Sequence, residues 1–316
     1  MIRLAVLGAG NHSSEVHGRA LEIVRRRRPG TFAIAAVCDL DESRARQYAE
    51  RFGAGAVYTD YARMLDVERP DALLAITPIE HTERIVADLL PRGLPLLIEK
   101  PPGADADAAE RLAALAAEHA APHMVSFNRR FTPALARVRQ WIAADPEARR
   151  PRLILARMLR RRRLDGDFIR GTAIHQIDAI VSFLGPATAV TAERRRTGDA
   201  GLGIATWQAD FAEGARAAAV VAPDVGTLEE TYEFYGPDFT LTADALGGAV
   251  TIRQGGTLVE RIDGDADAPA VLANGTVAET EAFLDAVAGA GPYWPTLADT
   301  IPSMRLGETI ARQCGL

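Results

Sequence analysis

Lys100 is the only lysine of this 316-residue chain, and it stands in the stretch LLIEKPPG at residues 96–103. Every other basic residue among the 36 Lys and Arg is an arginine. A lysine ammonium can approach a reacting atom closely and exchange a proton, whereas guanidinium stays charged and is planar and bulky. We therefore expect a chemical role for Lys100. The alternative is a surface lysine that occurs at this position by chance.

A glycine-rich stretch, GAGNHS, follows the first apolar run of the chain. Gly8 permits a tight turn, Gly10 lets the backbone approach a pyrophosphate, and Ser13 is small where the dinucleotide fingerprint prefers Gly or Ala. We expect Asn11 and His12 to line the same turn. The alternative is that the glycines serve only a turn.

The second apolar run, FAIAAVC, ends at Asp39. An acid at this position would accept hydrogen bonds from the adenosine ribose hydroxyls and would repel a 2′-phosphate. The sequence therefore predicts NAD as the cofactor, with NADP the less favoured choice. The alternative is that Asp39 only caps the helix that follows.

The order of the predicted elements indicates two domains. Residues 2–98 alternate short β-like runs with helix-length segments, which is typical of βαβ units and a parallel sheet. From residue 152 the strands come in series, which indicates a mostly antiparallel sheet. We therefore predict an α/β protein with a doubly wound Rossmann domain at 1–122 and an α+β domain with a large open sheet at 123–316. A helix at about 298–313 is a candidate to pack back on the first domain.

Composition excludes several classes of partner. The net charge of −6 argues against a nucleic-acid partner and against a basic membrane-binding surface. No apolar run approaches the roughly 20 residues of a membrane span. The two cysteines, Cys38 and Cys314, are too far apart in sequence to suggest a metal pair, and no metal site is predicted. We expect a cytoplasmic protein.

Six short motifs together resemble a known family. GAGNHS, VCDLD, AITPIEHT, IEKPPG, FNRRFTP and AIHQID, in this order, are similar to the glucose–fructose oxidoreductase, inositol dehydrogenase and MocA family of NAD(P)-dependent oxidoreductases. The resemblance covers the first 185 residues, and IEKPPG is its most specific element. It implies a Rossmann domain joined to an α/β domain whose open sheet carries the substrate site and often an oligomer interface, here of a homodimer or homotetramer.

The resemblance also assigns positions to individual residues. In the family's Glu-Lys-Pro motif the lysine faces substrate beside the nicotinamide, and the peptide bond that follows is often cis. Lys100 would then be catalytic. The remaining expected positions are Thr77, Pro78, His81 and Glu99 on the nicotinamide side, and Asn128 and Arg129 between cofactor and substrate.

A second chemical element is the predicted helix GTAIHQIDAIVSFLG, which carries His175 and Asp178. Histidine suits proton transfer near neutral pH, and residues three apart share a helix face, so Asp178 could orient the ring or contact substrate. The alternative for Asp178 is that it only caps a neighbouring segment. The family has an acid four residues before the histidine, where this chain has Gly171. Asp165 or Asp167 could replace that acid. Otherwise His175 is a structural histidine at a domain junction.

Arginines concentrate near the same helix. A substrate-contacting role is expected for Arg129 and Arg170, and Arg157 and residues 160–163 lie close by in the sequence. Arginine binds carboxylate and phosphate in bidentate fashion, so an anionic small-molecule substrate is one interpretation. The other is a solvated strand face in an arginine-rich chain.

These residues together predict an NAD-dependent oxidoreductase. It would transfer a hydride between nicotinamide and a secondary alcohol of a sugar, cyclitol or sugar-acid-like substrate, with Lys100 and His175 exchanging the hydroxyl proton. Two alternatives stay open at this point. One is a non-catalytic dinucleotide-binding sensor or partner protein, and the other is an NAD-dependent hydrolase or lyase that uses transient oxidation.

Overall fold

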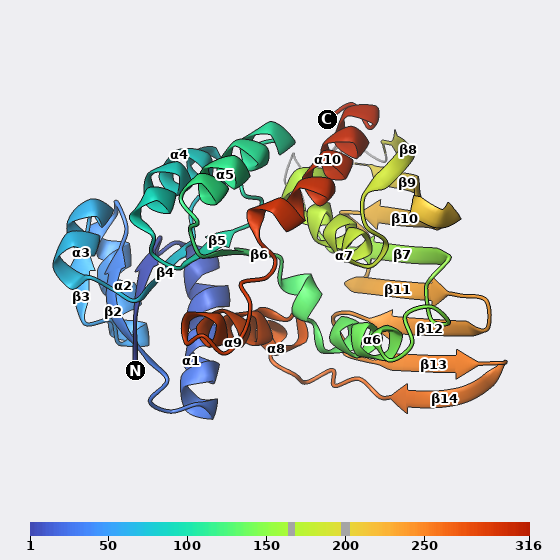
Figure 1. The fold of residues 1–316 in the computed structure, drawn as a ribbon, viewed down its shortest axis with the longest axis horizontal. Coiled ribbons are helices and arrows are strands. Elements are labelled where there is room, and N and C mark those ends of the chain that lie inside the picture. Colours follow the sequence, from blue (N-terminus) through green and yellow to red (C-terminus); the bar gives the residue numbers. More distant parts are fainter. Residues whose placement is uncertain (164–167, 197–202) are drawn as a thin grey trace. The chain divides into compact units, whose positions relative to one another are not determined.

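The computed structural model describes residues 1–163, 168–196 and 203–316. The chain folds into two compact units. Figure 1 shows their helices and strands, coloured along the sequence. The first unit comprises residues 1–127 and 276–301, and the second comprises residues 128–275 and 302–316.

The first unit is built on a six-stranded parallel sheet, here called sheet A. Its strands are β1 (Ile2–Leu7), β2 (Phe32–Cys38), β3 (Ala56–Tyr58), β4 (Ala72–Ala75), β5 (Leu96–Glu99) and β6 (His123–Ser126). They lie in the order β3-β2-β1-β4-β5-β6. This is the Rossmann order, and the predicted doubly wound sheet is confirmed. Strands β4, β5 and β6 are buried throughout, as expected for a sheet that helices cover on both faces.

The helices of the first unit follow the strands in regular alternation. They are the π-helix η1 (Ser13–Gly18), α1 (Arg19–Arg27), α2 (Glu42–Phe52), α3 (Tyr61–Glu68), α4 (Ile79–Leu89), the 3₁₀ turn η2 (Leu90–Arg92), α5 (Ala106–Glu118) and α9 (Thr276–Val287). Aspartates cap three of them. Asp41, Asp60 and Asp105 accept hydrogen bonds from first-turn backbone amides, which fixes where α2, α3 and α5 begin.

Two segments predicted for the second domain lie in the first unit. Residues 123–126 form β6 and pair in parallel with β5, so the boundary falls after residue 127 and not after residue 122. Helix α9 packs on α1, and Arg28 donates to Asp285 at 2.6 Å. No sequence pattern predicts that the chain returns to the first unit at α9, because this packing is set by contacts between residues far apart in the sequence.

The second unit is built on an eight-stranded sheet, sheet B. Its strands are β7 (Leu153–Leu159), β8 (Ala187–Arg195), β9 (Ile204–Phe211), β10 (Arg216–Ala222), β11 (Glu229–Tyr235), β12 (Phe239–Asp244), β13 (Val250–Gln254) and β14 (Thr257–Ile262). Their order is β14-β13-β12-β11-β7-β10-β9-β8, and only the β7–β10 pair is parallel. The predicted mostly antiparallel sheet is confirmed.

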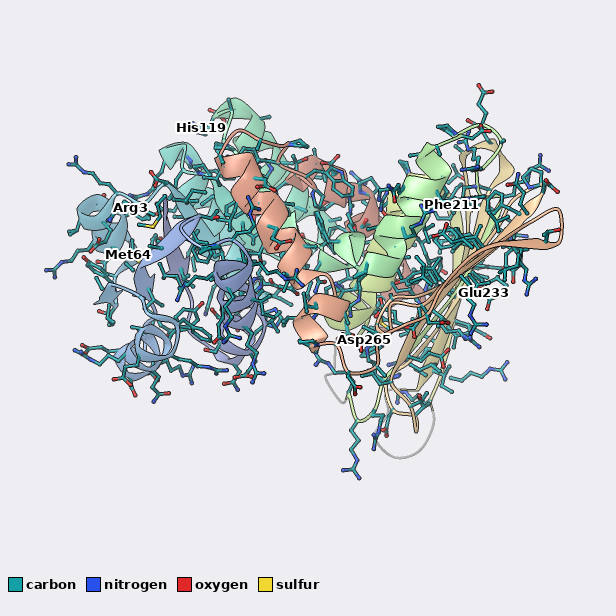
Figure 2. The ribbon with its side chains drawn as sticks, turned by 90° about the horizontal axis from the view of Figure 1, so that it is seen from below. Arg3, Met64, His119, Phe211, Glu233 and Asp265 are labelled. Carbon is teal, nitrogen blue, oxygen red and sulfur yellow. The ribbon has the colours of Figure 1, made fainter. Side chains whose placement is uncertain are left out.

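Sheet B has helices on one face. The helical elements of this unit are the 3₁₀ turn η3 (Asn128–Phe131), α6 (Pro133–Ala143), the π-helix η4 (Ile169–Ala173), α7 (Ile174–Leu184), the 3₁₀ turn η5 (Ala212–Gly214), α8 (Ala270–Ala273) and most of α10 (Leu297–Gln313). Figure 2 shows α7 against one face of the sheet and Glu233 on the opposite face. Strand β11 accordingly buries Glu230, Tyr232 and Phe234 and leaves the alternate residues partly exposed.

No helix among the described residues is both long enough and apolar enough to cross a membrane.

Candidate functional site

The glycine-rich turn after β1 has the geometry that a pyrophosphate site needs. Gly8 adopts a φ of +98°, and a Cβ there would lie 2.0 Å from the carbonyl oxygen of Ile76, so the turn requires glycine. A Cβ on Gly10 would meet no described atom within 4 Å. The backbone at Gly10 is therefore open to a ligand from that side, as the dinucleotide fingerprint requires.

Asp39, at the end of β2, is hydrogen-bonded to this turn. One carboxylate oxygen accepts from the amide of Ala9 at 2.7 Å, and the other accepts from the amide of Asp41 at 2.9 Å. Each carboxylate oxygen can accept a further hydrogen bond. Asp39 thus fixes the turn and can still accept hydrogen bonds from a ribose diol. Its binding of the ribose stays a prediction.

The carboxyl ends of β1, β4 and β5 lie side by side in sheet A. The chain order reverses between β1 and β4, which is the switch point where open α/β sheets bind ligands. Thr77 and Pro78 follow β4, and His81 is exposed on α4. Lys100 follows β5 directly and is partly exposed, and its peptide bond to Pro101 is cis. The structure thus brings the residues predicted for the cofactor and Lys100 to one edge of one sheet.

Glu99 is buried and faces two histidines of the first helical segment. Its carboxylate oxygens lie 3.3 Å from His12 Nε2 and 2.9 Å from His17 Nε2. Burial by itself would raise the pKa of Glu99, but the two imidazoles outweigh it and hold this pKa well below its ordinary value. Sequence reasoning placed Glu99 on the nicotinamide side and did not single out His17, whose only signal was a histidine four residues after Ser13.

In the second unit, Asp178 forms a buried bidentate pair with Arg130. The guanidinium donates to the two carboxylate oxygens at 2.7 and 2.8 Å, and Ser303 donates to Asp178 at 2.7 Å. Asp178 has no exposed surface. It was predicted to contact substrate, but these contacts describe a residue that holds α7, η3 and α10 together, and we do not carry it into the proposed site.

His175 lies in the first turn of α7 and is partly exposed. It directly follows the π-helix η4, which contains Gly171 at the position of the family's acid. Asp165 and Asp167, the two candidates to replace that acid, lie outside the described residues. The catalytic role of His175 stays a prediction.

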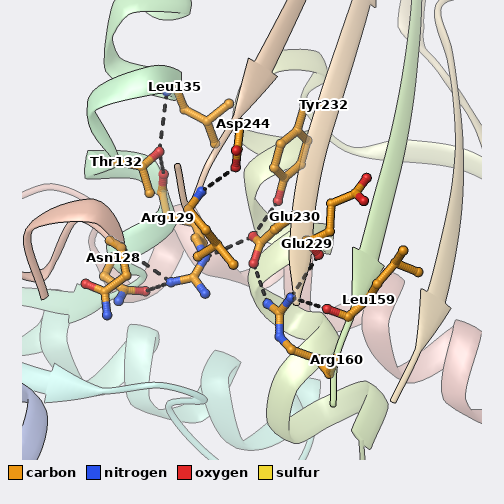
Figure 3. Close-up of polar contacts among 12 residues, drawn as sticks. Asn128, Arg129, Thr132, Leu135, Leu159, Arg160, Glu229, Glu230, Tyr232 and Asp244 are labelled. Atoms are coloured by element: carbon orange, nitrogen blue, oxygen red, sulfur yellow. Dashed lines mark hydrogen bonds and ion pairs between the residues drawn. The ribbon is translucent and has the colours of Figure 1, made fainter. Parts of the chain in front are cut away.

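Arg129 belongs to a second buried charge cluster, which Figure 3 shows. Glu230 accepts from Arg129 at 2.9 Å, forms an ion pair with Arg160, and accepts from the hydroxyl of Tyr232 at 2.9 Å. Burial would raise the pKa of Glu230, but the two arginines outweigh it and lower this pKa. Sequence reasoning missed Glu230. The available signal was strand alternation, which places Glu230 on the same buried face of β11 as Tyr232 and Phe234.

The predicted arginines do not all lie in one cluster. Along β7 the residues alternate between faces, and Arg157 lies on the exposed face beside Glu229 and Thr231. Arg160, directly after β7, is buried against Glu230. Arg170 approaches the carbonyl oxygen of Leu316 at 3.5 Å. These contacts do not support the interpretation of one arginine-lined anion site.

The first part of the chain matches a known family model. Residues 2–127 match the family model GFO_IDH_MocA, described as an oxidoreductase family with an NAD-binding Rossmann fold. An inositol 2-dehydrogenase of Corynebacterium glutamicum (strain R) is 26% identical over 186 residues, which cover 57% of this chain and 53% of that protein. The chain thus matches about half the length of this curated relative.

Solved structures extend the likeness of fold to the whole chain. The UDP-N-acetylglucosamine 3-dehydrogenase GnnA from Acidithiobacillus ferrooxidans superposes with a TM-score of 0.84 at 22% identity, covering 99% of this chain and 97% of that one. A levoglucosan dehydrogenase in complex with NADH and levoglucosan gives a TM-score of 0.85 at 17% identity, with the same coverages. Residues 2–127 match the model of the GFO_IDH_MocA oxidoreductase family with its NAD-binding Rossmann fold, the family that the sequence resemblance indicated.

Proposed function

We propose that the chain is an NAD-dependent dehydrogenase that oxidises a secondary alcohol of a sugar, cyclitol or related polyol. One observation carries the proposal: the only lysine ends strand β5, two strands from the glycine-rich turn after β1. Neighbouring strands lie about 4.8 Å apart, so roughly 10 Å separates the two strand ends. A dinucleotide whose pyrophosphate binds the turn can extend its nicotinamide over that distance.

The residues present fit the cofactor. Gly10 leaves its side of the turn open, and the Asp39 carboxylate can accept further hydrogen bonds. We assign the cofactor contacts to Gly8, Gly10, Asn11 and His12 at the pyrophosphate, Asp39 at the ribose, and Thr77, Pro78 and His81 toward the nicotinamide. When bound, NAD⁺ supplies the acceptor for the hydride that leaves the substrate carbon.

Lys100 accepts the hydroxyl proton and stabilises the negative charge on the substrate oxygen. As the carbon loses its hydride, the hydroxyl proton passes to the Lys100 amine, and the resulting ammonium stabilises negative charge on the oxygen. His175 is the second group able to carry this proton near neutral pH. The carbonyl product, the reduced cofactor and one proton account for all atoms of the alcohol.

The ion pairs of the second unit favour an uncharged substrate. Arg130 is matched by Asp178, and Arg129 shares Glu230 with Arg160, so these guanidinium groups are engaged with buried carboxylates. Recruiting one of them for a substrate carboxylate would leave a buried acid poorly compensated. The compounds for which two of the similar proteins are named, inositol and levoglucosan, are neutral polyols.

Reduction of NAD⁺ by matched substrate pairs tests this function. Each neutral sugar or cyclitol is assayed beside the corresponding acid, at low and high salt, by absorbance of NADH. We expect turnover of neutral members at rates that salt changes little. Preference for the acids, weakened by salt, would refute the charge assignment. The absence of NADH with every secondary alcohol, in protein that binds NAD, would refute the dehydrogenase.

We also infer that the open face of sheet B joins copies of this chain into a homodimer or homotetramer. A depression of about 570 Å³ on this face is lined by apolar side chains, among them Leu155 and Val220, and by charged ones, among them Arg157, Glu193 and Glu233. Among the described residues, the helices that contact sheet B lie on the other face (Figure 2). Analytical ultracentrifugation of wild-type and Val220→Asp protein tests the inference, since a charge at the centre of an apolar interface should shift the equilibrium toward monomer.

A further inference from the structure

Three side chains of the first unit converge beside the glycine-rich turn. His12 precedes η1, His17 lies near its end, and Glu99 ends β5. One ligand atom of each, an imidazole nitrogen or a carboxylate oxygen, lies within 4.8 Å of the other two. They thus form a compact cluster in which two strand ends and one helical segment meet.

The π-helical winding of η1 explains why the two histidines meet. They are five residues apart, and in a π-helix the hydrogen bonds run from residue i to i+5, so residues at this spacing lie roughly one above the other. Their ring centroids are 5.5 Å apart in an edge-on arrangement. An α-helix would turn the same positions to different faces.

Two imidazoles and one carboxylate make a donor set for divalent transition metals. Zinc binds nitrogen and oxygen donors at about 2.0–2.1 Å, and tetrahedral geometry then places neighbouring donors about 3.3 Å apart. His12 lies 3.3 Å from one Glu99 oxygen and His17 lies 2.9 Å from the other, and one donor atom of each residue lies within 4.8 Å of the other two. Small side-chain rotations would bring the three donors to the spacing that zinc requires.

Access to the cluster comes from one side. The side chain of His12 is 53% exposed, whereas those of His17 and Glu99 are buried. A metal held here would be reached from solvent past His12 and would keep open positions for water. The Nδ1 atom of His17 is buried and makes no hydrogen bond to the described residues, so its ring has its polar contact on the Glu99 side.

We propose that His12, His17 and Glu99 form a binding site for one divalent transition-metal ion of the zinc type. The site shares His12 with the turn proposed to bind the pyrophosphate, so its test measures zinc binding in the absence of NAD and does not depend on turnover. A bound ion would join the glycine-rich turn to the end of β5, and it would raise the melting temperature because it binds the folded chain alone.

Zinc titration of untagged, chelator-treated protein tests the site. Isothermal titration calorimetry is expected to give saturable binding of one zinc ion, and cobalt(II) should produce visible absorption bands of an imidazole- and carboxylate-bound ion. His12→Ala removes a half-exposed ligand and leaves the core intact, and it should weaken zinc binding at least about 10-fold. Glu99→Gln, of the same size, should do the same.

His119→Ala is the matched control, because His119 is exposed at the end of α5 and lies outside the cluster. It should bind zinc as the wild type does. Binding that is equally tight in wild type and His12→Ala would place the metal elsewhere and overturn the proposal. So would the lack of saturable zinc binding in wild type.

Discussion

Replacing Lys100 with arginine tests the proposed chemistry at its most specific point. The substitution keeps a positive charge at the end of β5 while replacing an amine that can exchange a proton with a guanidinium that stays charged. The Gly8 turn and Asp39 lie on other strands and are unchanged. Folding and NAD binding should therefore survive, which the melting temperature with and without NAD verifies.

The expected loss of rate follows from two effects. Removal of a general acid–base group lowers rates by about 10²–10⁴-fold, and a displacement of about 1 Å, caused by the bulkier guanidinium, can itself cost roughly 10²-fold. These effects overlap, so we expect kcat to fall by about 10²–10⁴-fold. This corresponds to about 3–5 kcal/mol of transition-state stabilisation.

The assay is steady-state NADH formation with a neutral polyol that the wild type oxidises. Arg111→Lys is the matched control, since Arg111 pairs with Glu83 on the surface of α5 and the reverse exchange there should leave kcat unchanged. Wild-type turnover in a folded Lys100→Arg protein would remove the catalytic assignment. The lysine in LLIEKPPG would then be a residue placed by chance.

Three further predictions concern carboxylates. NAD should raise the melting temperature more than NADP at equal concentration, and Asp39→Ala should narrow the difference because it removes the group that repels a 2′-phosphate. Asp178→Ala should lower the free energy of unfolding, measured in urea, by about 3–5 kcal/mol, because it leaves the buried Arg130 without its carboxylate. Glu213→Ala, which breaks an exposed ion pair, should leave the free energy of unfolding at the wild-type value. The pKa of Glu99 is lowered by folding, so its contribution exists above the unfolded pKa and is lost as pH falls through the folded one. The difference in unfolding free energy between wild type and Glu99→Gln should therefore shrink below about pH 4.

The parallel sheet and its cofactor edge could be predicted because their signals are local. Each of three strands carries its own signal within a few residues: one is followed by Gly-x-Gly, one by an acid, and one by Glu-Lys-Pro. Parallel strands align their carboxyl ends, so Gly8, Asp39 and Lys100 had to meet at one edge. The structure shows them at that edge of sheet A.

The partners of buried charges could not be predicted in the same way. Arg130 and Asp178 are 48 residues apart, and Arg129 and Glu230 are 101 apart, so only the fold decides which pairs form. Sequence reasoning therefore treated Arg129 and Asp178 as groups available to substrate. Strand alternation could have indicated that Arg157 in β7 and Arg160 directly after it point to opposite sides, because an odd spacing separates them.

The helix after the glycine-rich turn shows a further limit. As an ordinary α-helix, with about 100° per residue, the segment would place His12 and His17 about 140° apart around its axis, where they could not share a ligand. The structure winds residues 13–18 as a π-helix and brings both rings to Glu99. No residue type in SSEVHG demands this winding. Gly18 lies so close to Phe52 that a Cβ there would come within 2.5 Å of the ring, a contact that only the fold creates. The three-residue cluster therefore becomes visible only in the folded chain.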